Sequence, residues 1–156
     1  MDQHSIAVIG GDGIGPDVLK EGQIALETLA EITGSIAWEF VEFPWGCNYY
    51  LEHGLMMPED ALETLRTFDA IYFGACGFPS VPDHISLHGL LLPIRQTFQQ
   101  YVNLRPVRLL PGLTSPLLGK GPADINFLCV RENTEGEYAG IGGHLHRGMP
   151  HEVAVE

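Results

Sequence analysis

Short apolar runs alternate with amphipathic stretches along the first part of the chain. Residues 6–9 have the length and composition of a buried strand, and residues 36–43 alternate between apolar and polar positions as a second strand. Between them, residues 17–32 place apolar side chains on one helical face, with Pro16 at the first helical position and Gly34 just after the end. Strand, helix and strand in this order favour a parallel sheet covered by helices, an α/β fold.

The same patterns continue to the end of the sequence. Helices are predicted at 47–53, 58–65 and 87–101, and strands at 69–75, 103–110, 124–130, 140–147 and 151–156. Pro93 either kinks the third of these helices or marks the start of its regular part. Ligands bind beyond the carboxyl ends of parallel strands, so the loops after residues 9 and 75 are expected to face one crevice.

Composition narrows the class of protein. With 156 residues, of which 45% are hydrophobic, the chain can build a packed core. A net charge of -12 argues against binding to nucleic acid or to an anionic membrane surface. No apolar run approaches the ~20 residues that cross a bilayer, and no basic leader precedes the first strand, so a cytoplasmic location is expected. Three cysteines without CxxC spacing indicate neither a disulfide framework nor a zinc site.

A glycine-rich loop, residues 10–15, joins the first strand to the first helix. Its spacing does not match the G-x-G-x-x-G fingerprint of dinucleotide-binding proteins. A tight turn that requires positive φ angles is the favoured interpretation, and phosphate binding remains the alternative.

Positive charge gathers in one part of this acidic chain. Arg95 lies in a predicted helix, and Arg105 and Arg108 lie in the extended segment that follows. The planar guanidinium offers two parallel hydrogen bonds to a carboxylate, so Arg95 and Arg105 are candidates for binding an anion. Salt bridges with the twenty Asp and Glu residues explain the spacing equally well.

Polar residues also follow the strand predicted at 124–130. Residues 131–138, Arg-Glu-Asn-Thr-Glu-Gly-Glu-Tyr, come directly after this apolar run, where α/β proteins often place their chemistry. Further on, His144 and His146 alternate along a predicted strand. They are either a metal-binding pair or exposed histidines on a polar face.

Four motifs in register resemble the metal-dependent β-decarboxylating dehydrogenases, the isocitrate/isopropylmalate dehydrogenase family. They lie at 6–18, 69–75, 103–108 and 131–138, and the segments 82–95 and 100–108 most resemble the tartrate and D-malate branch. The resemblance implies an isopropylmalate-dehydrogenase-like α/β fold, distinct from the Rossmann fold, with three layers around a central mixed sheet that is incomplete here. It also implies two domains, 1–102 on the cofactor side and 103–156 for dimerisation and substrate.

The resemblance further implies an enzyme that depends on NAD and on Mg or Mn. Such an enzyme oxidises and decarboxylates a 2-hydroxy dicarboxylic acid such as tartrate or D-malate, and it is a homodimer. The implied positions are Arg95, Arg105 and Arg131 for the substrate carboxylates, Tyr138 as the catalytic proton donor, and Ile14, Gly77 and Asn103 near the cofactor. A 3-isopropylmalate dehydrogenase and a non-catalytic truncated or regulatory chain are the alternatives.

Family members are longer than this chain. Their metal ligands and catalytic lysine are expected in a carboxyl-terminal part, with no metal ligand among the present residues. The chain is therefore interpreted as an amino-terminal fragment that is inactive alone and either aggregation-prone or loosely folded. His88 lies near the expected specificity segment, either as a ligand contact or as a helix-surface histidine.

Overall fold

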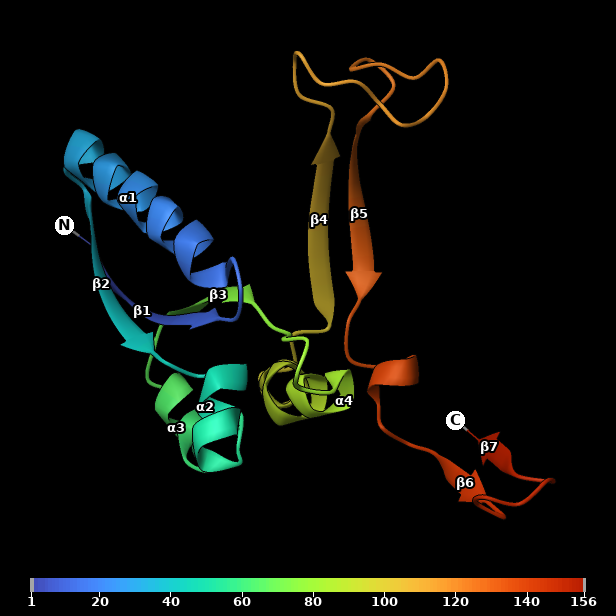
Figure 1. The fold of residues 1–156 in the computed structure, drawn as a ribbon. Coiled ribbons are helices and arrows are strands. Elements are labelled where there is room, and N and C mark those ends of the chain that lie inside the picture. The colour runs from blue at the N-terminus through green and yellow to red at the C-terminus, as the bar shows by residue number, and fades with distance from the viewer. Residues whose placement is uncertain (1, 156) are drawn as a thin grey trace. The chain divides into compact units, whose positions relative to one another are not determined.

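The chain forms two compact units, divided after Thr97. The structure is a computed structural model that describes residues 2–155 (Figure 1). Strands β1 to β3 and helices α1 to α5 belong to the first unit, and strands β4 to β7 belong to the second. The domain limits implied by the sequence, 1–102 and 103–156, stay a prediction.

A parallel sheet organises the first unit. Its strands are β1 (Asp2–Gly11), β2 (Ile36–Phe43) and β3 (Ala70–Ala75), in the order β2-β1-β3. Both neighbours run parallel to β1. Helix α1 (Gly15–Thr33) connects β1 to β2. The predicted β-α-β opening and the α/β class are therefore confirmed.

Helix α1 covers one face of this sheet. Ile6 and Val8 of β1 are buried against Leu19 of α1, with Trp38, Phe40 and Tyr72 packed around them. The indole Nε1 of Trp38 donates a hydrogen bond to the carbonyl oxygen of Leu26, at 3.0 Å. The intervening residues Ala7 and Ile9 point to the opposite face and are fully buried. Helices α2 (Cys47–His53) and α3 (Ala61–Leu65) lie on that side (Figure 1).

Glycine ends two of the helices as predicted. Gly34 follows α1 with φ 63°, and its N–H bonds to the carbonyl oxygen of Ala30. Gly54 follows α2 with φ 77°, and its N–H bonds to the carbonyl oxygen of Tyr50. Both are left-handed caps that L side chains adopt only with strain. The helix predicted at 58–65 begins only at Ala61.

The helix predicted at 87–101 is wrong at both ends. Three consecutive helical segments form instead: α4 (Asp83–Ser86), a π-helical turn η1 (Leu87–Leu91) and α5 (Leu92–Thr97). Proline lacks the N–H that would bond four residues back, and the wider turn before Pro93 absorbs this loss. The N–H of Leu92 reaches the carbonyl oxygen of Leu87, five residues back. Pro93 thus marks the start of the regular helix.

Antiparallel pairs make up the second unit. Strands β4 (Val102–Arg108) and β5 (Asn126–Glu132) form one pair, and β6 (Gly143–Leu145) and β7 (Val153–Val155) form another. Among residues 2–155, the parallel and antiparallel strands thus form separate sheets. No helix in this part of the chain has the length and apolar character needed to span a membrane.

Candidate active site

The loop between β1 and α1 is a tight turn whose backbone packs closely against the end of β3. Gly11 and Gly13 have φ angles of 69° and 57°, which glycine adopts without strain. A Cβ on Gly15 would collide with the carbonyl oxygen of Gly10 and the N–H of Ala75. The geometry supports the turn interpretation of these glycines. Ile14, predicted to lie near the cofactor, is 68% exposed at the N-terminal end of α1.

Asp12 connects this loop to two other segments. Its carboxylate is 3% exposed; Oδ1 accepts a hydrogen bond from the N–H of Cys47 at 2.8 Å, and Oδ2 accepts one from the N–H of Gly77 at 2.9 Å. The N–H of Asp12 itself bonds to the carbonyl oxygen of Ala75, at 2.7 Å. The loops after β1 and β3 therefore lie side by side, and the expectation that they face one crevice stays a prediction. The importance of Asp12 was missed, although a carboxylate directly after a buried strand was its signal.

Two thiols near Asp12 are poor nucleophiles. Burial, together with a hydrogen bond to Asp12, raises the pKa of Cys47 to about 12. Burial and the charge of Asp12 raise the pKa of Cys76 to about 11. Since the thiolate is the reactive form, neither cysteine is suited to covalent catalysis near neutral pH.

Arg95 lies on the short helix α5 of the first unit. Leu92 and Ile94 of this helix are buried, and Arg95 is half-buried. His88 is exposed on the π-helical turn that precedes α5. The proposed contacts of both residues with a ligand stay predictions.

The β4–β5 pair gathers three of the predicted residues. Asn103 lies directly opposite Arg131, and Arg105 lies opposite Cys129. Since directly opposed residues and those two positions apart share a face, Asn103, Arg105 and Arg131 lie on the same face of the pair. Arg108 is an odd number of positions away from Arg105 and lies on the other face. The register therefore places Arg105 and Arg131 on one face of the pair and Arg108 on the other.

Tyr138 joins this group through Arg131. Nη2 of Arg131 donates a hydrogen bond to the hydroxyl oxygen of Tyr138, and the guanidinium carbon is 5.0 Å from the centre of the tyrosine ring. Tyr138 lies on a short 3-10 turn, Gly136–Tyr138. Both side chains are half-buried. A cation and a hydroxyl are therefore placed beside each other, as carboxylate binding and proton transfer would require.

Two residues that the sequence did not single out shape this part of the site. Asn133 is buried; its Oδ1 accepts a hydrogen bond from Asn103 at 3.4 Å, and its Nδ2 donates one to the carbonyl oxygen of Gln100 at 3.3 Å. Glu132 accepts hydrogen bonds from the N–H groups of Thr134 and Glu135. Burial works to raise the pKa of Glu132, but these bonds outweigh it and lower the pKa to about 2. An ionised Glu132 thus shapes the turn that leads to Tyr138.

The histidines of the β6–β7 arm do not form the shared strand face considered from the sequence. Nδ1 of His144 is 2.6 Å from a carboxylate oxygen of Glu152. His146 follows the end of β6 with φ 56°, and its ring lies beside that of His151, with ring centres 4.4 Å apart and the planes tilted by 55°. The positive φ of His146 breaks the alternation of side chains along a strand that the prediction assumed. Among residues 2–155, no three His, Cys, Asp or Glu side chains are placed to hold a metal ion.

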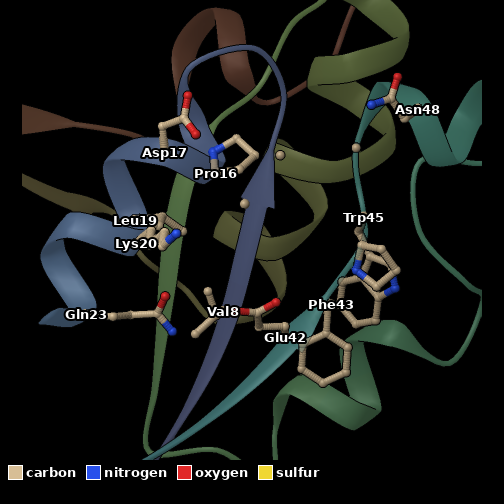
Figure 2. A pocket seen from close by; sticks show the side chains of 14 residues that line it. Val8, Pro16, Asp17, Leu19, Lys20, Gln23, Glu42, Phe43, Trp45 and Asn48 are labelled. Carbon is tan, nitrogen blue, oxygen red and sulfur yellow. The ribbon is translucent and has the colours of Figure 1, made fainter. Parts of the chain in front are cut away.

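A cavity of about 650 Å³ opens between α1 and the carboxyl ends of β1 and β2. Figure 2 shows Val8, Leu19 and Trp45 in its wall and the polar groups of Asp17 and Lys20 around it. None of the site residues predicted from the sequence lines this cavity. Its lining includes Gly10, Gly11 and Pro16 of the motif at 6–18, and none of the positions to which the resemblance gives a role.

Known proteins resemble the chain over its whole length. It is 57% identical to the D-malate dehydrogenase [decarboxylating] of Escherichia coli and 53% identical to a probable tartrate dehydrogenase/decarboxylase of Agrobacterium vitis; each comparison covers all of this chain and 44% of the relative. A crystal structure of a beta-decarboxylating dehydrogenase from Thermococcus kodakarensis matches with a TM-score of 0.60 and 33% identity, over 97% of this chain and 40% of that one.

The chain thus spans less than half the length of these relatives. The sequence pattern of the isocitrate/isopropylmalate dehydrogenase family matches residues 5–156, including both units and every predicted site residue. Together with the parallel β-α-β unit and the shared face of Asn103, Arg105 and Arg131, this match shows that the chain belongs to the isocitrate/isopropylmalate dehydrogenase family.

Proposed function

We propose that the full-length gene product carrying this chain oxidises and decarboxylates a 2-hydroxy dicarboxylic acid, such as D-malate or tartrate, with NAD and a divalent Mg or Mn ion. The observation that carries the proposal is the common face of Arg105 and Arg131, with Tyr138 bonded to Arg131. The names of the relatives support the substrate class. We also propose a cytoplasmic homodimer.

In this proposal the guanidiniums bind the substrate carboxylates. Arg105 and Arg131 each offer parallel N–H groups to such a carboxylate. The hydroxyl of Tyr138 delivers a proton to the enol that remains after carbon dioxide leaves. Its hydrogen bond to Arg131 holds that hydroxyl next to the substrate-binding cation.

Two features of the first unit support the proposal that a nucleotide cofactor binds there. No side chain caps the N–H groups at the start of α1, and a Cβ on Gly13 or Gly77 would meet nothing within 4 Å. These open backbone positions lie beside Ile14. When bound there, NAD accepts the hydride from the substrate. No group of three metal ligands occurs in residues 2–155, so we assign no step to the metal through these residues.

The test compares two arginine variants of the full-length gene product. Formation of reduced NAD is measured with D-malate, tartrate, 3-isopropylmalate and isocitrate. Arg105→Met removes one bidentate partner, and with hydrogen bonds to charged groups contributing about 1.5–3 kcal/mol, KM for the diacid is expected to rise roughly 10- to 150-fold. Arg108→Met makes the same chemical change on the other face and is expected to leave KM nearly unchanged.

The comparison can fail in two ways. No reduced NAD with any of the four acids would refute the proposed activity. Equal losses in the two variants would show that the arginines act through general charge or stability, rather than through a face of the β4–β5 pair. A preference for 3-isopropylmalate would keep the reaction type and replace the substrate.

A further inference from the structure

We propose that Asp12 is a positioning residue for cofactor binding, because it fixes the loop at Gly77 beside the turn at Ile14. The inference rests on the proposed function, in which these two loops contact NAD. Asp12 itself is 3% exposed and is not offered as a contact to any ligand.

The buried carboxylate of Asp12 accepts hydrogen bonds from two other segments. A buried carboxylate is unfavourable unless hydrogen bonds replace the lost water. Here each oxygen accepts one backbone N–H from a different segment: Cys47 at the start of α2, and Gly77 after β3. These two bonds hold together three loops that are distant in sequence. Asp12 is thus a connection between segments as well as a part of its own turn.

The backbone at Gly46 packs closely against the carboxylate of Asp12. A Cβ on Gly46 would lie 2.9 Å from Oδ1 of Asp12. Gly46 has φ 154°, a backbone conformation that L side chains rarely adopt. The backbone at Gly46 therefore packs closely against the carboxylate and leaves little room for a side chain at position 46.

The loop at Gly77 has contacts within itself and a bond to Asp12. Downstream, Phe78 and Val81 form an isolated bridge, with the N–H of Val81 bonded to the carbonyl oxygen of Phe78. This bridge is internal to the loop and does not attach it to β1. In addition to the backbone bond from the N–H of Asp12 to the carbonyl oxygen of Ala75, the bond from the N–H of Gly77 to Oδ2 of Asp12 attaches this loop to the turn at Ile14. Losing the bond to Gly77 is expected to loosen the loop while leaving the sheet intact.

Asp12→Asn is the sharpest perturbation. The amide keeps the shape of the side chain but replaces one acceptor oxygen by an NH₂ donor, so one of the two N–H groups faces another donor. Asp60→Asn is the matched control, because Asp60 is exposed, belongs to the same unit and makes no side-chain capping bond to α3. Asp12→Ser is a second variant that keeps an acceptor and is smaller.

The experiment uses the full-length gene product. In Asp12→Asn, the Kd and KM for NAD are expected to rise about tenfold, as for the loss of one hydrogen bond to a charged group, whereas KM for the diacid changes less than about twofold. Amide hydrogen exchange is expected to quicken at Gly77 or Cys47 and to stay unchanged in β1. Asp60→Asn is expected to match the wild type.

Each outcome decides the question. Unchanged NAD affinity, or equal changes in NAD and diacid KM, overturns the inference, and so does failure of both Asp12→Asn and Asp12→Ser to fold. A wild-type protein that binds no NAD by calorimetry also overturns it. Binding of NAD without oxidation of any diacid refutes the proposed function alone, and the Kd for NAD in Asp12→Asn then still tests the role of Asp12.

Discussion

Gly74→Ala tests whether close backbone packing defines the site. Gly74 lies in β3, and a Cβ at this position would collide with the carbonyl oxygen of Gly10 and lie 3.1 Å from both the carbonyl carbon of Gly10 and Cα of Gly15. All three are backbone atoms, which cannot move aside by a change of rotamer. The methyl group must therefore push β3 away from the turn between β1 and α1.

The expected loss follows from this geometry. Inserting a methyl group into a packed interior typically destabilises a protein by about 1–3 kcal/mol. For a domain of 150–250 residues, about 2–4 °C of Tm is lost per kcal/mol, so Tm is expected to fall by roughly 2–12 °C. The displaced turn carries Ile14 and Asp12, so the affinity for NAD should fall with it.

Two other glycines serve as matched controls. Gly34 has φ 63° and open space around it, so Gly34→Ala tests the backbone angle alone, with an expected loss of about 1–2 kcal/mol. Gly121 has neither a positive φ nor a neighbour within 4 Å, and Gly121→Ala should leave stability unchanged. Thermal unfolding of the full-length gene product is followed by circular dichroism. Equal Tm values for Gly74→Ala and Gly121→Ala would refute the reasoning.

Three further predictions concern single side chains. Tyr138→Phe is expected to slow proton delivery by about 10²–10⁴ and hydride transfer far less, because only the hydroxyl bonded to Arg131 is lost; single-turnover measurements showing equal slowing of both steps would contradict this role. In native protein at pH 8, iodoacetamide is expected to modify exposed Cys129 much faster than Cys47 or Cys76, whose pKa values are about 12 and about 11; peptide mass mapping that finds Cys47 modified as fast would show otherwise. The pKa of Glu132 falls from 4.5 to about 2, so its contribution to stability is complete above pH 4.5 and is lost as pH falls toward 2. Tm should then fall more steeply over this range in wild type than in Glu132→Gln, and parallel curves would argue against it.

Local signals explain which elements were predicted well from the sequence. Strand β2 and helix α2 have the predicted bounds, because each is delimited by a local stop: Gly34 before β2, and Gly54 after α2. The helix at 87–101 was wrong because a single proline can be absorbed in more than one way. Leu90 and Leu92, close to Pro93 in the sequence, are both buried, and the sequence pattern does not show which residues pack against them.

Some features of the site also follow from the local sequence pattern, whereas others depend on distant residues. The alternation of residues 102–108 contains the information that Arg105 and Arg108 point to opposite faces, and only the pairing of β4 with β5 adds that Arg131 shares the face of Arg105. Asp12 follows a buried strand, but this signal alone did not rank it above other polar residues, and Asn133 had no such signal. Their importance comes from burial and from partners 30 or more positions away.

The seven predicted site residues belong to both units. Ile14, Gly77 and Arg95 lie in the first, and Asn103, Arg105, Arg131 and Tyr138 lie in the second. Each group is held by its own contacts: the tight turn after β1 and Asp12 in one unit, and the β4–β5 register with Asn133 in the other. Substitutions at Ile14 and Gly77 should therefore alter the affinity for NAD, and those at Arg105 and Arg131 the affinity for the diacid. A variant such as Asp12→Asn that raised both KM values equally would show that the two groups do not act separately.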